Sequence, residues 1–373
     1  MQSSNHMFLR LIIGSLWLAL SYQALHGQEW ARAIEPREWT FPRDHGAHPE
    51  FKTEWWYYTG NLKCSASDKH FGYQLTFFRQ GVQPSPSVLD SSWSLRDIYF
   101  AHFAITDVSD QKFYSAEKVS RGNLDQAAYS QEQMDIRLNN WQIQQLDKDQ
   151  FKLRAKESEF ALELEVNSAK PMVLQGQRGL SRKTDIEGEA SYYYSYTRLL
   201  SQGTIRIGDQ NYEVQGNSWF DHEFMTNVLS SSIVGWDWFS IQLDSNQELM
   251  LYQLRNDLGQ VKKWSKGVLI QPDGSLIQLD PKSITFHVID TWKSSHNGAI
   301  YPSTWKIEYS PLELELLIKP QKNDQEFLVT RFQSMSYWEG TCQISGKVQG
   351  QQTQGYGYTE LTGYSSPIRG MSK

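Results

Sequence analysis

Hydrophobic and polar residues alternate with a period of two along most of the chain, which is the pattern of half-buried β-strands. The segment FGYQLTFFR places Tyr73, Leu75 and Phe77 on one face of a strand, and EFALELEV and LELELLI alternate as regularly. Turn sequences such as IGDQ, LDSNQE and QPDGSL separate these runs. The pattern predicts an antiparallel all-β protein, built either as a sandwich or as barrels.

Two segments depart from simple alternation. DIYFAHFAITDV is apolar on both faces, with Phe100 and His102 on one side and Ala101 and Phe103 on the other. The best helix candidate is short, NLDQAAYSQEQM at residues 123–134, and no long amphipathic helix is predicted.

A weak internal repeat divides the chain in two. EWWYYTGNL, a turn and YQLTFFR in the first half correspond to GWDWFSIQL, a turn and YQLRNDLG in the second. Later in each half, Trp219-x-Asp221 corresponds to Tyr358-x-Glu360. A repeat of this length indicates two similar barrels in tandem with a boundary near residues 224–234, although chance matching in an aromatic-rich β-sequence is the alternative.

Composition narrows the classes of partner. The 373 residues carry a formal net charge of −6 and contain no basic run, so nucleic acid is not an expected partner. The chain has 14 Trp, 19 Tyr and 17 Phe, and large aromatic side chains suit pleated surfaces and ligand cavities. We therefore expect a small hydrophobic or amphipathic molecule as the partner.

The N-terminus has the pattern of a secretory signal peptide. Arg10 precedes an apolar run from Leu11 to about Leu20, and cleavage is expected after Gly27. The run is short for a membrane span, so an uncleaved anchor is the weaker alternative. We predict that residues 1–27 are removed and that the mature chain is periplasmic or secreted, without a transmembrane span; the sequence does not indicate its oligomeric state.

The chain has two cysteines, Cys64 and Cys342, which lie far apart in the sequence. A disulfide between them is possible in an oxidising compartment, but the fold cannot depend on a disulfide framework.

An acid followed by four aromatic residues stands out in FKTEWWYYTGNL, where Glu54 precedes Trp55, Trp56 and Tyr57. The run is either a ligand site or a well-filled barrel wall. Because GWDWFSIQL repeats it, we interpret it as the opening strand of a barrel that packs on both faces where two barrels meet. Glu54 and Asp237 lie beside a tryptophan in related positions and stay candidates for the site.

The segment NSWFDHEF contains the strongest acid–base candidates, Asp221, His222 and Glu223. Because consecutive strand residues point to opposite faces, Asp221 and Glu223 share one face and His222 takes the other. A carboxylate beside His222 in an apolar cavity would hold its tautomer and tune its pKa. The alternative is that these acids pair with Arg or Lys where the two domains meet.

A second aromatic cluster follows two cations in GLSRKTDIEGEASYYYSYTRL. Arg182 and Lys183 precede Tyr193 and Tyr194, and Arg198 closes the segment. Tyrosine hydroxyls and a cation around an apolar space suit an amphipathic ligand with one polar end. Cross-strand packing of Tyr under Arg side chains explains the pattern equally well.

The sequence gives no basis for a metal or an organic cofactor. His45 and His48 have a His-x2-His spacing, but they lie in a Pro/Gly loop and lack the helical spacing of a zinc site, so we predict no metal. Nucleophile-elbow, phosphate-binding and dinucleotide-binding motifs do not occur either, and no arrangement of residues supports hydrolysis.

These segments together resemble the AttH-like, carotenoid 1,2-hydratase-like lipocalin family, whose members are often described as secreted hydrolases. The resemblance runs in order from about residue 36 to 365 and rests on FPRDHGAHPEFKTEWWYYTGNL, FGYQLTFFR, GNSWFDHEF, GWDWFSIQL and GYGYTELTGY. It implies two tandem antiparallel lipocalin-like β-barrels packed side by side, with domains at residues 28–226 and 227–373.

The resemblance implies less about activity. Relatives include hydratases that add water to an isoprenoid double bond and fungal proteins implicated in cyclisations. In the hydratases the segment matching WFDHEF reads Asp-His-Asn-Trp; this chain keeps Asp221 and His222 but has Glu223 and Phe224. An acid of raised pKa, Asp221 or Glu223, would be the proton donor.

Three functions remain open: binding of a hydrophobic or amphipathic molecule, acid-catalysed hydration, isomerisation or cyclisation of a polyene, and a structural or export-accessory role. The candidate catalytic residues are Asp221, His222 and Glu223. The candidate ligand-binding residues are Glu54, Trp55, Trp56, Tyr57, Arg79, His102, Arg182, Lys183, Tyr193, Tyr194, Trp236, Asp237 and Trp238. Trp236 and Trp238, on either side of Asp237, would offer aromatic faces to a cation.

Overall fold

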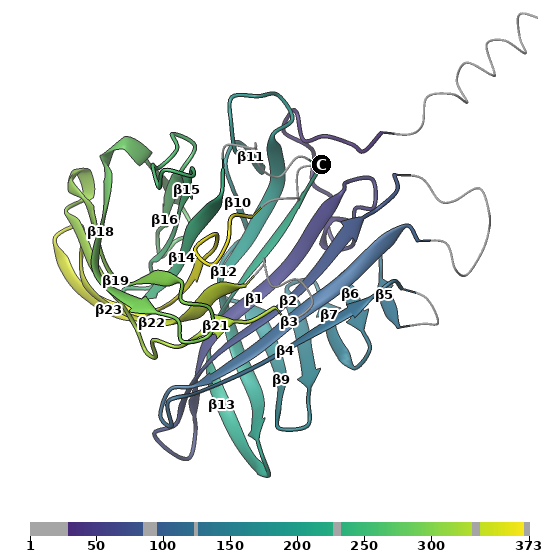
Figure 1. The fold of residues 1–373 in the computed structure, drawn as a ribbon, viewed down its shortest axis with the longest axis horizontal. Helices are drawn as coiled ribbons and strands as arrows, with labels where there is room; N and C mark the ends of the chain where they lie inside the picture. The colour runs from purple at the N-terminus through teal and green to yellow at the C-terminus, as the bar shows by residue number, and fades with distance from the viewer. Residues whose placement is uncertain (1–28, 85–94, 123–125, 227–232, 330–335, 369–373) are drawn as a thin grey trace, which may run out of the picture.

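The computed structural model shows a protein built from two β-sheets (Figure 1). It describes residues 29–84, 95–122, 126–226, 233–329 and 336–368. The predicted signal peptide lies outside the described residues. Within the described part of the chain, helical structure consists of short 3-10 turns such as η1 (Arg43–His45), η3 (Pro281–Ser283) and η4 (Ser310–Leu312), and no helix is long and apolar enough to cross a membrane. The all-β prediction is confirmed.

The first sheet curls into a nearly closed barrel, which we call barrel 1. Its strands are β1 (Thr53–Cys64), β2 (His70–Gly81), β3 (Asp97–Asp107), β4 (Lys112–Ser120), β5 (Ala127–Tyr129), β6 (Asp135–Leu138), β7 (Trp141–Asp147), β8 (Gln150–Lys156), β9 (Phe160–Ser168), β10 (Val173–Leu174), β11 (Leu180–Arg182), β12 (Ala190–Ile207) and β13 (Gln210–Met225). The strand order is β4-β3-β2-β1-β13-β12-β9-β8-β7-β6-β5, and β10 and β11 pair with β12.

The second sheet forms a half-barrel, which we call barrel 2. Its strands are β14 (Gly235–Leu243), β15 (Glu248–Arg255), β16 (Lys266–Ile270), β17 (Leu276–Leu279), β18 (Ile284–Lys293), β19 (Ile300–Tyr309), β20 (Leu314–Pro320), β21 (Glu326–Phe327), β22 (Tyr337–Val348) and β23 (Gln351–Leu361). The order is β17-β16-β15-β14-β23-β22-β20-β19-β18, with β21 paired to β22.

The two sheets share one topology. In each, the opening strand lies between the second strand and the last one: β1 between β2 and β13, and β14 between β15 and β23. This confirms the two tandem barrels predicted from the repeat and the lipocalin-like architecture that the family resemblance implies. The last strand of barrel 1 ends at Met225 and the first of barrel 2 begins at Gly235, and the exact domain border between residues 226 and 227 stays a prediction.

Strand alternation fills the inside of each barrel with apolar side chains. The predicted face of Tyr73, Leu75 and Phe77 on β2 is fully buried in the core of barrel 1. Barrel 2 has its own core, in which Phe239 and Trp305 pack edge to face. A third cluster lies between the barrels and contains the aromatic residues Tyr57, Tyr193, Trp219, Trp238, Tyr252 and Tyr358.

The helix predicted at residues 123–134 is wrong in the part that the structure describes. Ala127–Tyr129 form strand β5, which pairs with β6. The Tyr129 ring packs edge-on against Trp56 at 5.4 Å and tilted against Tyr99 at 4.4 Å. Backbone pairing and burial of this ring override the helix propensity of the Ala- and Gln-rich sequence.

Both cysteines are free thiols. Cys64 ends β1 and is half-buried, whereas Cys342 is buried on β22. The possible disulfide between them is not formed.

Candidate functional site

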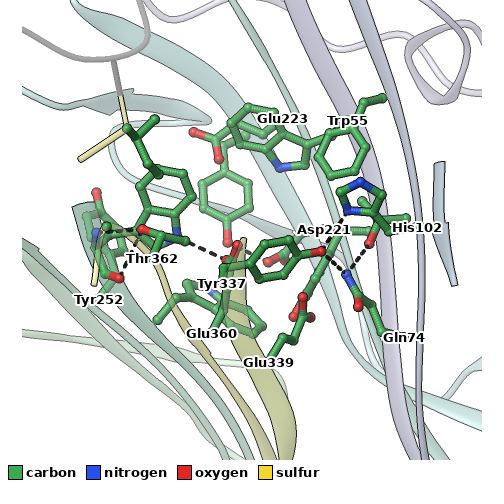
Figure 2. A pocket seen from close by; sticks show the side chains of 18 of the residues that line it. Trp55, Gln74, His102, Asp221, Glu223, Tyr252, Tyr337, Glu339, Glu360 and Thr362 are labelled. Atoms are coloured by element: carbon green, nitrogen blue, oxygen red, sulfur yellow. Dashed lines mark hydrogen bonds between the residues drawn. The ribbon is translucent and has the colours of Figure 1, made fainter. Parts of the chain in front are cut away.

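A cavity opens between the two barrels and takes its walls from both sheets (Figure 2). It encloses about 1180 Å³ when its open mouth is included. We call it the central cavity. Its lining residues are Trp55, Tyr57, Gln74, Thr76, Phe78, Phe100, His102, Lys183, Tyr193, Asp221, Glu223, Met225, Trp236, Trp238, Tyr252, Leu254, Ser336, Tyr337, Glu339, Glu360, Thr362, Gly363 and Ile368.

The alternation of β1 divides its aromatic run between two environments. Trp55 and Tyr57 line the central cavity, whereas Trp56 and Tyr58 are fully buried inside barrel 1. The run is therefore both a barrel wall and part of a cavity, because neighbouring strand residues face opposite sides.

Strand β14 repeats this arrangement in barrel 2. Trp236 and Trp238 line the central cavity, whereas Asp237 is turned away from it and fully buried. Asp237 bonds to Gln253 at 2.7 Å and to Arg255 at 3.1 Å. It is a partner of buried polar groups in barrel 2 rather than a cavity residue.

Asp221 lies on β13 and faces the cavity. Its carboxylate accepts hydrogen bonds from Ser195 Oγ at 2.5 Å, Tyr193 Oη at 2.7 Å and Trp219 Nε1 at 2.8 Å. Burial nevertheless raises the pKa of Asp221 to about 7, because desolvation of the charge outweighs these three bonds. Asp221 can therefore gain or lose a proton near neutral pH.

Glu223, two residues further along β13, shares this face and forms an ion pair. Its Oε1 lies 2.6 Å from Lys183 Nζ, and it also accepts a bond from Ser191. Burial alone would lower the pKa of Lys183, but the charge of Glu223 raises it overall, so Lys183 is an ammonium. The sequence-based alternative, acids paired with Lys or Arg between domains, describes Glu223 well.

Two further acids of the cavity were missed as site residues in the sequence. Glu360 on β23 accepts a bond from Trp236 Nε1 at 3.0 Å, and its pKa is raised to about 7 by burial. The signal for Glu360 was present, because the repeat pairs it with Asp221. Glu339 lies opposite Glu360 on the neighbouring strand β22, and only the strand register brings it to the site.

Glu339 is the most isolated of these acids. It is 1% exposed, and neither carboxyl oxygen has a hydrogen-bond partner of ordinary geometry among the described residues. Burial and the charge of Glu360 raise its pKa well above 4.5, and polar contacts with Tyr57 and Tyr337 offset only part of the effect. Burial thus favours the protonated, neutral form of the Glu339 carboxyl group in the free protein.

A hydrogen-bonded group next to Glu339 links the two barrels (Figure 2). Tyr337 Oη lies 2.8 Å from His102 Nδ1 and accepts a bond of 2.8 Å from Gln74 Nε2. Burial lowers the pKa of His102 to about 3, so this imidazole is neutral. His102 thus lines the cavity as predicted, on the same side of β3 as Phe100.

His222 points away from Asp221 and Glu223, into barrel 1. Its Nε2 lies 2.9 Å from Glu54 Oε1, its Nδ1 lies 3.1 Å from Tyr194 Oη, and its ring stacks on Trp56. Burial lowers the pKa of His222 despite the bond to Glu54. The carboxylate expected beside His222 is therefore Glu54, and neither residue lines the central cavity.

Glu54 is the centre of a buried charge network. Its carboxylate also contacts His48 Nδ1 at 2.8 Å and Arg79 Nε at 3.1 Å. Burial alone would raise the pKa of Glu54, but the bonds from His222 and His48 and the charge of Arg79 hold it well below its usual range. Burial would likewise lower the pKa of His48, but its bonds to Asp44 and Glu54 raise it overall.

The residues His48, Glu54 and His222 carry potential metal-ligand atoms that all lie within 4.8 Å of one another. Their surroundings suit a hydrogen-bonded network better than a metal. Arg79 and His48 already neutralise Glu54, and both ring nitrogens of His48 are in use: Nδ1 lies 2.8 Å from Glu54 and Nε2 lies 3.1 Å from Asp44. A metal would have to displace protons and compete with the guanidinium.

The remaining predicted residues do not line the cavity. Tyr194 is inside barrel 1, where its hydroxyl lies 2.6 Å from His45 Nδ1. Arg79 donates to Asp97 at 2.8 Å as well as to Glu54. Arg182 is half-buried at the end of β11, one residue before Lys183. When the two barrels are compared by strand register, Asp237 corresponds to Trp56 and not to Glu54. Asp237 and Glu54 therefore lie on related faces of their strands but not at related positions.

The sequence matches the AttH-like family over residues 32–364. The chain belongs to this family. A solved structure of a protein from Nitrosomonas europaea, described as an AttH, is 31% identical to this AttH-like chain with a TM-score of 0.78, and the match covers 90% of this chain and 99% of that one. The resemblance seen in the sequence is confirmed.

Two further solved structures share the fold at lower identity. Kievitone hydratase from Nectria haematococca is 12% identical with a TM-score of 0.67, covering 91% of this chain and 96% of that one. CghA, solved with Sch210972, is 10% identical with a TM-score of 0.54, and the match covers 90% of this chain and 96% of that one. Comparison with curated protein sequences gave no match.

Proposed function

We propose that this AttH-like chain is an exported protein that binds a hydrophobic or amphipathic small molecule in the central cavity. The observation that carries the proposal is a cavity walled by aromatic side chains of both barrels, with a few buried polar groups converging on it. Small-molecule sites have this composition, because apolar walls supply affinity and a few polar groups orient the ligand.

The two barrels contribute matching halves of the cavity, and this supports a site rather than a packing defect. Trp55 and Tyr57 come from β1, and Trp236 and Trp238 come from β14. A site at a domain interface is a common location for small ligands. Export follows from the predicted signal peptide, and we place the mature protein in the periplasm or outside the cell on that basis.

A second candidate function is acid–base catalysis on the bound molecule, such as hydration, isomerisation or cyclisation of a polyene. The observation in its favour is that Asp221 and Glu360 both have a pKa of about 7 inside an aromatic cavity. A carboxyl group with such a pKa can donate a proton to an alkene at neutral pH and recover it afterwards. Kievitone hydratase, whose name describes a hydration, has the same fold, and at 12% identity the similarity extends to the fold alone.

The test is to purify the full-length protein from the envelope of its own host and to examine it by native mass spectrometry and solvent extraction. We expect a bound organic molecule that is lost in a Trp238→Asp variant, which places a charge on the cavity wall. A Trp292→Asp variant, on β18 of barrel 2 and away from the cavity lining, serves as the matched control.

The outcomes separate the candidate functions. A retained molecule that is recovered unchanged after incubation supports binding, and a molecule that is recovered as a hydrated or isomerised product supports catalysis. Absence of any extracted molecule, together with no saturable tryptophan quenching by added amphipathic probes, would overturn both and favour a structural or export-accessory role.

A further inference from the structure

The charges of the central cavity define the polar end of its ligand. We infer that the molecule bound there is an organic cation, an amphipathic amine or quaternary ammonium compound, whose charged group lies beside Glu339 and Glu360. The inference rests on the proposed binding function and adds the chemical class of the ligand.

The first observation is the isolation of Glu339. Its side chain is 1% exposed and lines the cavity, yet neither carboxyl oxygen has a hydrogen-bond partner of ordinary geometry among the described residues; its polar neighbours are Tyr57, Tyr337 and Gln74. Tyr57 Oη and Gln74 Oε1, in the same lining, also lack one. Buried polar atoms are almost always satisfied, so a group of polar atoms without well-formed hydrogen bonds in one cavity indicates that a molecule from outside the chain completes their surroundings.

The second observation is the charge balance of the lining. Four carboxyl groups line the cavity, those of Asp221, Glu223, Glu339 and Glu360. Among the described lining residues, Lys183 is the one ammonium group, and it is already paired with Glu223 at 2.6 Å. The other three acids have no cationic partner in the lining, and a positively charged ligand would supply it.

The third observation is that the cavity already surrounds one ammonium group, that of Lys183, with aromatic rings and a carboxylate, as we propose for the ligand. Lys183 Nζ lies 5.1 Å from the centre of the Tyr252 ring and 5.5 Å from that of Tyr193, with the Glu223 carboxylate in contact. Aromatic faces combined with a carboxylate are a general solution for binding ammonium groups. Tyr57 and Trp238, which pack edge to face at 5.3 Å, offer the same combination near Glu339 and Glu360.

A metal ion fits this place less well than an organic cation. The group of potential metal ligands found among the described residues lies in barrel 1 around Glu54, not in the central cavity. The lining beside Glu339 is mainly aromatic, and hard divalent cations require several oxygen ligands at short distances. A cation with an apolar body matches the walls and the acids together.

Ionisation of the acids couples binding to pH. The groups that face Glu339 are Glu360 and Tyr358 from β23, Tyr57 from β1 and Tyr337 from its own strand β22. Because burial favours the protonated form of these acids in the free protein, a cation that pairs with one of their carboxylates displaces a proton when it binds. Its affinity therefore rises with pH through neutrality, and binding releases protons to the buffer.

The test uses three probes that share one ring system: 2-naphthylmethyl-trimethylammonium, neutral 2-naphthylmethanol and anionic 2-naphthoate. Binding to the full mature chain is measured by quenching of tryptophan fluorescence and by calorimetry in two buffers of different ionisation enthalpy. We expect the cation to bind about tenfold more tightly than the alcohol at about pH 8. The preference should shrink at about pH 5, where the acids hold their protons.

The variant Glu339→Gln should remove most of this preference, measured as the ratio of the affinities for the cation and for 2-naphthylmethanol. Glu315→Gln, which alters a half-exposed acid on β20 outside the cavity, is the matched control and should keep the preference. Equal binding of the cation and the alcohol by the parent protein at about pH 8 would overturn the cation inference but leave the binding proposal intact. Failure of all three probes to bind saturably would overturn the binding proposal itself.

A second measurement, on the parent protein, tests the inference even if the Glu339→Gln variant does not fold. If Glu339→Gln is unfolded, as judged by circular dichroism, proton release by the parent protein decides the matter. Release of protons on binding of the cation, with none on binding of the alcohol, supports the inference. Cation binding without proton release and without pH dependence would overturn it.

Discussion

Asp221 on β13 and Glu360 on β23 occupy equivalent positions in the two barrels. Asp221 lies opposite Tyr57 on β1, and Glu360 lies opposite Trp238 on β14. Each carboxylate accepts a bond from an indole N–H and faces the central cavity. The tandem repeat therefore does more than duplicate a barrel, because it brings two acids with a pKa of about 7 to one site.

Because Asp221 and His222 point in opposite directions, we expect substitution of Asp221 to affect ligand binding and substitution of His222 to affect stability. Asp221→Asn changes a cavity residue, so we expect loss or alteration of ligand binding with a modest loss of stability. His222→Ala changes the inside of barrel 1, where it leaves a void and removes a partner of Glu54. We expect this variant to be less stable by about 3 kcal/mol.

Urea unfolding and native mass spectrometry on both variants distinguish the two effects. A folded His222→Ala protein that has normal stability but no longer retains the ligand would contradict this division. Phe224 also lies beside the network around Glu54, since its ring stacks on that of His48 at 3.7 Å, and it packs in a separate cluster with Phe51 and Tyr192.

Glu54→Gln should be among the most destabilising single changes in barrel 1. It removes the charge that balances Arg79 and His48 in a fully buried network, and breaking such a pair costs about 3–5 kcal/mol. The pKa of Glu54 is lower in the folded chain than its unfolded value of 4.5, so its contribution is present above about pH 4.5 and is lost as the pH falls.

The difference in unfolding free energy between Glu54→Gln and the parent should therefore be large at about pH 7 and shrink at about pH 3. Denaturant titrations at the two pH values measure it. Glu163→Gln, an exposed acid on β9 paired with Lys152, is the control and should change stability by less than about 1 kcal/mol. A pH-independent difference would show that charge is not the cause.

Much of the fold was accessible from the sequence because strand periodicity and turn chemistry are local signals. The alternation of Tyr73, Leu75 and Phe77 predicted the buried face of β2. The spacing of two residues between Asp221 and Glu223 predicted that both side chains lie on the same face of their strand. The helix predicted around Tyr129 failed because its environment is set by distant strands.

The site was harder to predict because it depends on register between strands far apart in the chain. Glu339 joins the cavity through pairing with Glu360, and it has no local motif around it. Glu54 and His222 are 168 residues apart, so their 2.9 Å contact could be named as a possibility but not chosen over Asp237. Tertiary packing decides which face of a strand points into its own barrel and which faces the other barrel.

Glu339→Gln should make the free protein more stable at alkaline pH. The folded chain keeps Glu339 protonated well above the pH at which the unfolded chain loses that proton, near 4.5. Over this range the unfolded state binds fewer protons, so stability falls as the pH rises. The glutamine carries no such cost.

We expect thermal unfolding of Glu339→Gln and the parent to coincide at about pH 4 and to diverge in favour of the variant at about pH 8, by about 1–3 kcal/mol. The measurement is made without ligand, because a bound cation would stabilise only the parent. A variant that is less stable than the parent at the higher pH would show that Glu339 is ionised and satisfied in the folded chain.

Gly72→Val should disturb the contact between the two barrels. Gly72 is on β2 of barrel 1, and a Cβ atom there would lie 2.6 Å from both Cβ and Cγ2 of Thr341 on β22 of barrel 2. The absence of a side chain thus lets the sheets approach closely. Beside it, Asn61 donates to the Gly357 carbonyl at 3.3 Å and so ties β1 to β23.

Overpacking at this contact should cost about 1–3 kcal/mol and widen the central cavity, since Gln74 on the same strand lines it. Urea unfolding measures the loss, and the affinity for 2-naphthylmethanol reports on the cavity. Gln352→Val introduces the same side chain at an exposed position on β23 and should change stability by less than about 0.5 kcal/mol. Equal effects of the two substitutions would mean that the barrels yield at Gly72 without strain, and that their separation is not fixed by this glycine.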